Sequence, residues 1–168
     1  MIFNKIRTGI GYDVHQLADG EVLIIGGVAI KHTKGTIAHS DGDVLIHALC
    51  DAILGAAALG DIGTHFPDTD PSLKGIESTI LLKKTCILLE GRGYSVGNID
   101  CVVCLQKPKI AVYIPLMKES LAKVMSINES QINIKATTTE KLGFVGREEG
   151  VSAYVSVLIV ENNFKDSF

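Results

Sequence analysis

The apolar stretch from Val151 to Val160 constrains the fold of this chain more than any other segment. It falls well short of the roughly 20 residues that a membrane-spanning helix needs, so we expect it to be the last and longest strand of a sheet. Gly26-Gly27, flanked by two short apolar runs, predicts a hairpin over residues 22–30. The other predicted strands are residues 6–14, 99–106 and 132–136.

Segments with helical spacing of apolar residues alternate with these strands. Ser40-Asp41-Gly42-Asp43 has the residue types of a helix start, and the apolar pattern after it predicts a helix that ends near Gly60. Two more helices are predicted over residues 75–90 and 110–125. We therefore expect an α+β fold of one domain, residues 1–168. This is a two-layer sandwich with a mixed sheet of about four strands, a short hairpin, and helices packed on one face.

Composition narrows the class of protein. Apolar residues make up 46% of the 168 residues, which is enough for a buried core. The formal charge of −3 gives no electrostatic basis for binding nucleic acid or an acidic membrane surface. Residues 1–11 lack the apolar core of a secretory signal, which favours a bacterial, cytoplasmic location; a mature plastid form is also compatible with the sequence.

Cys101 and Cys104 form a lone CxxC pair inside the apolar run of residues 99–105. Residues three apart on a strand point to opposite faces, so the two thiols cannot easily share a metal ion. We therefore interpret them as buried free thiols that behave as small apolar side chains, rather than as a zinc or redox site. Free thiols also favour a reducing compartment.

Asp13 and His15 are candidate metal ligands. Two residues apart on an extended chain, they point to the same side, so a carboxylate oxygen and an imidazole nitrogen can reach one ion. His47, in the middle of the first predicted helix, would complete a set of two histidines and one carboxylate, which is typical of catalytic zinc. Spacing alone favours the alternative that His47 is a hydrogen-bonded core histidine and Asp13 a cap, because nothing local brings His47 to the pair.

Other segments carry groups suited to phosphate chemistry. His39 and Ser40 lie at the predicted helix start, where free backbone N–H groups attract anions; plain helix capping is compatible with this role. Thr137-Thr138-Thr139 offers hydroxyl donors, and Glu140 is an oxygen ligand suited to magnesium. Cations are added by Arg147 and by Lys107-Pro108-Lys109. With the metal set, and without a P-loop or a serine nucleophile elbow, these groups predict metal-assisted chemistry on a phosphate.

Four motifs that occur in order make the chain resemble a known family. They are Gly11–His15, His39–Asp43, Gly60–Asp70 and Lys135–Arg147. With them, residues 6–160 closely resemble the 2-C-methyl-D-erythritol 2,4-cyclodiphosphate synthases of the non-mevalonate isoprenoid pathway. The resemblance implies a catalytic domain whose substrate is 4-diphosphocytidyl-2-C-methyl-D-erythritol 2-phosphate. The 2-phosphate of this substrate would attack the β-phosphorus, and the products would be a cyclic diphosphate and CMP.

The resemblance also implies two metal ions. Asp13, His15 and His47 match ligands of zinc, or of another divalent transition metal, which reverses the interpretation of His47 from spacing alone. Glu140 matches a ligand of magnesium or manganese. The protein needs no nucleophile of its own, because the substrate brings the attacking phosphate.

Further residues match the walls of the substrate site. His39 and Thr138 match groups that stabilise the transition state. The erythritol side is implied to comprise Asp61, Ile62, Gly63, Phe66, Pro67, Asp68, Thr69 and Asp70. The cytidine and phosphate side is implied to comprise Leu105, Gln106, Lys107, Pro108, Lys109, Ile110, Ala111, Thr137 and Thr138. Other implied contacts are Asp13, Val14, His15, Ser40, Thr139, Glu140, Phe144 and Arg147. Lys107 departs from the family, where a small residue is common, which weakens the expectation of a cytidine contact there.

The resemblance implies a homotrimer with active sites between subunits, for which the apolar last strand is the only support in the sequence. It further implies that Phe144, Arg147 and Glu149 surround a cavity on the trimer axis, where an isoprenoid diphosphate is a candidate ligand. A purely structural ion pair between Arg147 and Glu149 is an equally supported alternative, and Glu148 is expected to be exposed. Two other functions stay open: a metal-dependent phosphatase or nucleotide hydrolase, and a non-catalytic nucleotide- or metal-binding module.

Overall fold

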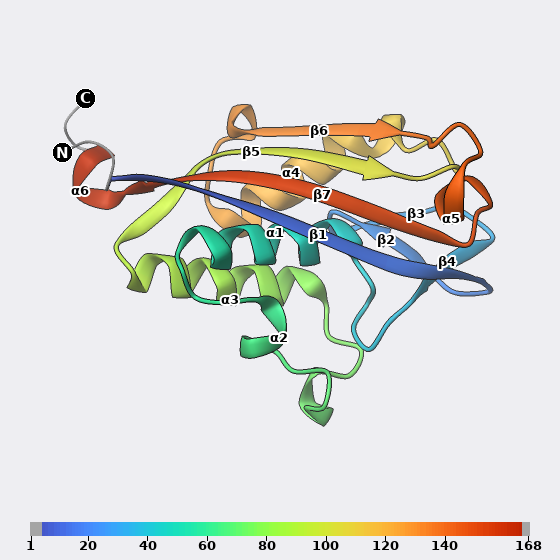
Figure 1. Cartoon of the computed structure of the whole chain (residues 1–168), viewed down its shortest axis with the longest axis horizontal. Helices are drawn as coiled ribbons and strands as arrows, with labels where there is room; N and C mark the ends of the chain where they lie inside the picture. Colours follow the sequence, from blue (N-terminus) through green and yellow to red (C-terminus); the bar gives the residue numbers. More distant parts are fainter. Residues whose placement is uncertain (1–4, 166–168) are drawn as a thin grey trace.

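A computed structural model describes residues 5–165 and shows one layer of strands backed by helices (Figure 1). The sheet has five strands in the order β4-β1-β7-β5-β6, and β2 and β3 form a separate hairpin. The strands are β1 Ile6–Asp19, β2 Leu23–Ile25, β3 Val28–Ile30, β4 Lys34–Ile37, β5 Tyr94–Cys104, β6 Ile132–Thr137 and β7 Gly150–Glu161. The α-helices are α1 Val44–Ala56, α2 Ile62–His65, α3 Ser78–Gly91, α4 Ile114–Met125, α5 Gly143–Gly146 and α6 Asn162–Lys165. Short 3-10 turns cover Pro71–Leu73, Ala111–Tyr113 and Glu129–Gln131.

The long strands β1, β7 and β5 form the middle of the sheet. β7 runs antiparallel to β1 from Val160 opposite Ile6 to Gly150 opposite Gln16, and antiparallel to β5 on its other side. β5 and β6 are parallel, so the sheet is mixed. The segment from Val151 to Val160 is the last strand of the sheet, as predicted, and lies at its centre, with both of its edges and one of its faces covered. The expectation that it is the longest strand was wrong, because β1 has 14 residues and β7 has 12.

Helix α1 packs directly against β1 because two glycines of the strand leave room for it. A Cβ atom at Gly9 would overlap the carbonyl oxygen of Ala52, and one at Gly11 would overlap that of Ala48. The backbones of helix and strand can therefore approach more closely than side chains would normally permit. Most of α1 is buried, since β1 and β7 cover one side of it and α3 lies on another.

The other face of the sheet carries no helix among residues 5–165. Ile10 is 76% exposed there, and Tyr12 and Tyr154 stack on each other with ring centroids 4.8 Å apart while remaining about half exposed. The prediction that the helices pack on one face is confirmed. What remains is a strip of large apolar side chains on the open face, which a monomer would leave in water.

The sequence-based prediction was wrong in the number of strands. The sheet has five strands rather than four, because β4 pairs antiparallel with the end of β1 from Lys34 opposite Asp19 to Ile37 opposite Gln16. The four residues Lys34–Ile37 are too short and too mixed to show a strand pattern, and β1 extends to Asp19 beyond the predicted end at Val14. The predicted domain of residues 1–168 includes residues 1–4 and 166–168, which lie outside the described residues. The expectation that residues 1–11 are not a secretory signal also concerns residues 1–4.

Two smaller expectations concern membranes and thiols. No helix within residues 5–165 has the length and apolar character needed to cross a membrane. Both cysteines are free thiols on β5, and Cys101 is fully buried as expected, whereas the expectation of burial was wrong for Cys104, which is half-buried. They lie on alternate faces of that strand, as the spacing predicted.

Candidate functional site

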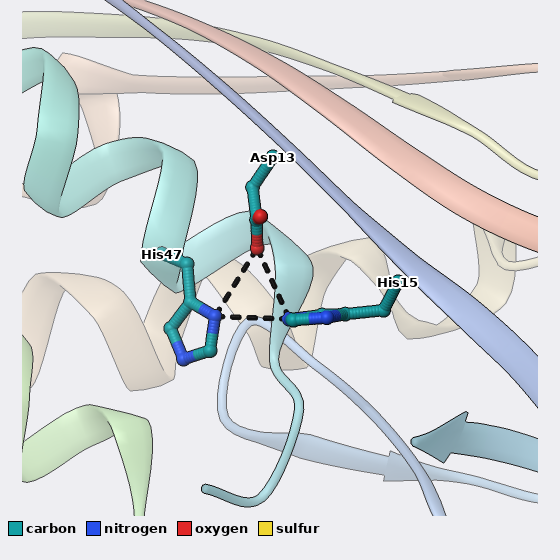
Figure 2. Close-up of side chains that lie close together, drawn as sticks. All are labelled: Asp13, His15 and His47. Atoms are coloured by element: carbon teal, nitrogen blue, oxygen red, sulfur yellow. Dashed lines mark hydrogen bonds and ion pairs between the residues drawn. The ribbon is translucent and has the colours of Figure 1, made fainter. Parts of the chain in front are cut away.

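Asp13, His15 and His47 converge on one point, as Figure 2 shows. Asp13 Oδ2 lies 3.1 Å from His15 Nε2 and 3.1 Å from His47 Nδ1, and the two nitrogens are 3.0 Å apart. Two imidazole nitrogens and one carboxylate oxygen form the donor set of catalytic zinc, which keeps a fourth position open for water or substrate. These residues fit a divalent transition metal.

Local structure explains why the three side chains meet. Asp13 and His15 alternate with exposed neighbours on β1, so both point toward the helical layer. His47 lies beside Ala48, the residue whose carbonyl abuts Gly11 of β1, so close packing of α1 on β1 carries the imidazole to Asp13. The side chains of Asp13, His15 and His47 keep 24%, 16% and 12% exposure, which leaves the site open to a ligand.

The ligand set is electrostatically coupled. Burial alone would raise the pKa of Asp13, but hydrogen bonds and charge from His15 and His47 outweigh it and hold that pKa well below its usual range. Burial alone would lower the pKa of His47, but the hydrogen bond and charge of Asp13 outweigh it and raise that pKa. A cation is therefore favoured between these side chains, as a proton or as a metal ion.

Ser40, a predicted substrate contact, lies behind His47 together with Ser78 and Asp41, which were not predicted as functional residues. Ser40 Oγ is 3.1 Å and Ser78 Oγ 2.9 Å from His47 Nε2, the nitrogen that points away from Asp13. Ser78 Oγ in turn makes a short hydrogen bond with Asp41 Oδ1. Asp41 was interpreted only as part of a helix start and Ser78 had no signal at all, because the contacts join segments more than 30 residues apart.

Asp43 fixes the start of α1 and with it the position of His47. Its carboxylate accepts from Ile46 N at 3.0 Å as the N-cap, and from Gly26 N at 2.9 Å and Gly27 N at 2.6 Å in the β2–β3 turn. Full burial raises the pKa of Asp43 to about 6, although the three N–H donors favour its ionised form. At neutral pH a buried carboxylate thus joins hairpin and helix.

A pocket of about 260 Å³ adjoins the metal ligands. His39 and Ser40 line it, as do four residues of the predicted erythritol side: Ile62, Phe66, Pro67 and Asp68. His39 Nε2 lies 3.3 Å from the carbonyl oxygen of Asp70, which ties the loop before α1 to the far wall. Predicted residues from three sequence motifs therefore share one cavity.

Other residues predicted for this side do not line that pocket. Val14 is exposed on the open face of the sheet, opposite the metal ligands. Asp61 caps α2 through Thr64 N at 2.8 Å, and Asp70 caps the turn at Pro71–Leu73 through Ser72 N at 2.9 Å. The remaining predicted residues outside the lining are Gly63 and Thr69.

A second pocket, of about 180 Å³, lies at the carboxyl ends of β5 and β6. It shares no lining residue with the first pocket. Its lining contains most of the predicted cytidine side: Leu105, Gln106, Pro108, Lys109, Ile110, Ala111, Thr137 and Thr138. Lys107 is absent from this lining and pairs with Glu148 at 3.0 Å, so its departure from the family pattern falls outside the cavity.

Glu140 lies beside this second pocket rather than with the metal ligands. Thr138 Oγ1 donates to Glu140 Oε1 at 2.9 Å, and Glu140 is exposed. Its backbone is in the left-handed region with φ of 52°, as is that of Lys141 with 66°, conformations that cost non-glycine residues energy. In one chain the structure does not bring Glu140 to Asp13, His15 and His47.

Of the residues predicted for a trimer axis, Phe144 belongs to α5, and Arg147 and Glu149 lie between α5 and β7. Arg147 donates to both carboxylate oxygens of Glu149 at 2.9 Å, and both side chains are more than half exposed. Phe144 packs against Gly150, the first residue of β7. The expectation that Glu148 is exposed was wrong, since its side chain is only 29% exposed and pairs with Lys107 across the turn.

Comparison with known proteins places the chain among close relatives. The model of the YgbB family matches residues 6–160. The 2-C-methyl-D-erythritol 2,4-cyclodiphosphate synthase of Bacteroides thetaiotaomicron is 59% identical over 155 residues, which cover 92% of this chain and 98% of that protein. The enzyme of the same name from Azotobacter vinelandii is 54% identical and is covered to 99%.

Solved structures agree with these relatives. IspF of Plasmodium falciparum in complex with CDP superimposes with a TM-score of 0.83 at 36% identity, covering 95% of this chain and 99% of that one. The bifunctional IspDF of Campylobacter jejuni superimposes with a TM-score of 0.90 at 46% identity and covers 94% of this chain. The present chain spans only 42% of that longer protein.

Proposed function

The chain belongs to the YgbB family of 2-C-methyl-D-erythritol 2,4-cyclodiphosphate synthases, and from this premise we propose how its residues carry out the reaction. The activity is that of a lyase of the non-mevalonate isoprenoid pathway. In 4-diphosphocytidyl-2-C-methyl-D-erythritol 2-phosphate, an oxygen of the 2-phosphate forms a bond to the β-phosphorus. The bond from that phosphorus to the CMP oxygen breaks, so CMP leaves as 2-C-methyl-D-erythritol 2,4-cyclodiphosphate forms.

The convergence of Asp13, His15 and His47 is the observation that carries the proposal. These three residues would hold zinc or a similar ion, and Glu140 would hold magnesium or manganese. When bound, the two ions supply Lewis acidity and positive charge to the diphosphate. The ligand side chains are only partly exposed and belong to a strand and a helix of the core, so their geometry is set before substrate arrives.

His39 and Thr138 are proposed to stabilise charge that develops on the phosphates. His39 is exposed in the lining of the first pocket, and its Nε2 must be a donor toward the Asp70 carbonyl, which can only accept. Thr138 presents a hydroxyl in the second pocket, where Lys109 adds a cation. Phosphoryl transfer depends on such alignment and charge neutralisation more than on covalent help from the protein.

The cytidine moiety is assigned to the second pocket. Its walls combine Leu105, Ile110 and Ala111 with polar groups of Gln106 and Thr137, which suits a flat base with hydrogen-bonding edges. The CDP complex of the Plasmodium falciparum relative supports binding of a cytidine nucleotide. Phe144 and Arg147 remain proposed contacts in the same region.

A homotrimer would join the two pockets. In a single chain they share no residue, and one substrate must reach both. The open face of the sheet, with Ile10, Tyr12 and Tyr154, offers the apolar surface for assembly. We propose that the metal pocket of one subunit faces the cytidine pocket of its neighbour, where Glu140 would approach the diphosphate. A cytoplasmic, bacterial location and a single catalytic domain of residues 1–168 complete the proposal.

One incubation tests this function. The purified protein is mixed with 4-diphosphocytidyl-2-C-methyl-D-erythritol 2-phosphate, zinc and magnesium, and followed by phosphorus NMR. We expect the signals of a cyclic diphosphate together with CMP. Release of inorganic phosphate would instead identify a phosphatase or nucleotide hydrolase, and binding without turnover would identify a non-catalytic module.

A further inference from the structure

His47 has polar partners on both ring nitrogens. Nδ1 faces Asp13 and His15, whereas Nε2 faces the hydroxyls of Ser40 and Ser78 at 3.1 and 2.9 Å. Ser78 is fully buried and is the first residue of α3, so its hydroxyl is held in place. The serine therefore lies where it can select which nitrogen of His47 carries a proton.

The direction of these hydrogen bonds follows from the number of protons available. Ser78 has one hydroxyl proton and touches two groups, His47 Nε2 and Asp41 Oδ1. An ionised carboxylate only accepts, so the serine proton must point to Asp41. The serine oxygen is then an acceptor for His47, whose Nε2 must carry a proton. Nδ1 faces the Asp13 carboxylate, which also only accepts, so in the metal-free chain both nitrogens carry a proton, and a metal ion would replace only the proton on Nδ1.

Asp41 is itself fixed by the backbone. Its Oδ2 accepts from Ser78 N at 2.9 Å, and Oδ1 accepts from Asp43 N at 3.3 Å. The N-cap residue of α3, Glu77, makes no side-chain cap bond, so Asp41 supplies the missing acceptor from the loop before α1. The same carboxylate thus closes the start of α3 and orders the hydroxyl of its first residue.

We propose that Ser78 and Asp41 are positioning residues of the metal site. Through the hydrogen bonds Asp41–Ser78–His47 they hold the imidazole in the tautomer that presents the lone pair of Nδ1 to a zinc ion, and they make that nitrogen a stronger metal ligand. This role rests on the proposed zinc ligands Asp13, His15 and His47. Hydrogen-bond partners behind a metal-ligating histidine typically contribute about 10- to 100-fold in metal affinity.

Zinc affinity is the first measurement. The full chain is stripped of metal and titrated with zinc chloride against a chromophoric chelator. We expect Ser78→Ala to weaken zinc binding about 10- to 100-fold, Asp41→Asn to weaken it in the same direction, and Ser78→Thr, which keeps the hydroxyl, to restore most of it. Thr85→Val is the matched control, because it removes another fully buried hydroxyl from α3 without touching His47.

The proton on Nε2 of His47 is the second measurement and does not depend on metal. Nitrogen NMR of the metal-free protein should show a proton on Nε2 that exchanges slowly with water, because it is donated to the buried Ser78 hydroxyl, and Asp41→Asn should speed that exchange. An unprotonated Nε2 in the unaltered protein overturns the proposal, even if Ser78→Ala fails to fold. Unchanged zinc affinity in folded Ser78→Ala overturns it as well. If the unaltered protein binds no zinc, the proposed metal set fails, and the presence or absence of a proton on Nε2 still decides the direction of the hydrogen bond to Ser78.

Discussion

The two pockets of the protein differ in how rigidly the fold positions their functional side chains. Asp13, His15 and His47 belong to β1 and α1, are mostly buried, and interact within about 3 Å of one another. Glu140 and Arg147 belong to the short connections after β6 and are exposed. The comparison indicates that the core of a single chain preorganises the metal pocket, whereas the exposed segments with Glu140 and Arg147 are not fixed by that core.

Loss of His47 should have the largest effect. His47→Ala leaves two ligands, too few for tight zinc binding, and removes several kcal/mol of charge stabilisation, so we expect activity to fall by at least about 10³-fold. Zinc content by atomic emission should fall with it, while circular dichroism stays unchanged. His32→Ala serves as a control, because His32 lines neither pocket. Full zinc occupancy with normal turnover would refute the assignment of the metal pocket.

Disruption of the open sheet face should come next. Three chains of 18.0 kDa are expected in solution, and Ile10→Asp should convert the trimer to monomers, because it puts a charge on the apolar strip. Activity should be lost although zinc still binds, since each chain keeps its own ligands. Ile87→Asp, on the exposed side of α3, is the control. An active monomer by light scattering would show that one chain suffices.

The preorganisation of the metal pocket can be tested through Asp43. Asp43→Ala removes the acceptor for three backbone N–H groups and the cap of α1, so we expect the free energy of unfolding to fall by about 2–4 kcal/mol. Urea denaturation measures this loss. Asp61→Ala, which removes an exposed cap from the short helix α2, should cost much less. Equal losses would mean that the two caps do not differ in burial as the structure indicates.

A smaller change, in the magnesium dependence of turnover, is expected when Glu140 is replaced. Glu140→Gln keeps the shape of the side chain but offers a neutral oxygen where magnesium prefers a charged one. Zinc content should stay the same, while the magnesium concentration for half-maximal turnover rises about tenfold, equivalent to about 1.4 kcal/mol. Titration of activity with magnesium chloride gives the answer. An unaltered magnesium dependence would exclude Glu140 as a ligand.

The smallest effect concerns a ligand on the axis of the proposed trimer. If geranyl or farnesyl diphosphate binds a ring of Arg147 side chains, the melting temperature should rise with ligand concentration, and Arg147→Ala should abolish the rise. Within one chain Glu149 already neutralises Arg147 through two hydrogen bonds, so a ligand has to compete with this pair. If the melting temperature of Arg147→Ala rises with ligand as much as that of the unaltered protein, the ligand does not bind Arg147, and the pair Arg147–Glu149 has only a structural role.

The sequence by itself determined the elements and part of the site. Alternation along β1 puts Asp13 and His15 on one side, helical spacing after Asp43 defines α1, and the apolar run after Gly150 defines the last strand, β7. These inferences succeed because backbone periodicity decides which way neighbouring side chains point. The resemblance of the ordered motifs then supplied the family, which the relatives confirm.

Only the tertiary structure decided how distant segments meet. His47 reaches Asp13 because Gly9 and Gly11 admit α1 onto β1, and Ser78 reaches His47 because α3 begins beside the same loop. Spacing alone had favoured a core role for His47, gave no sign of Ser78, and missed the short strand β4. Local patterns are encoded over a few residues, but contacts across more than 30 residues depend on how whole elements pack, which no single segment specifies.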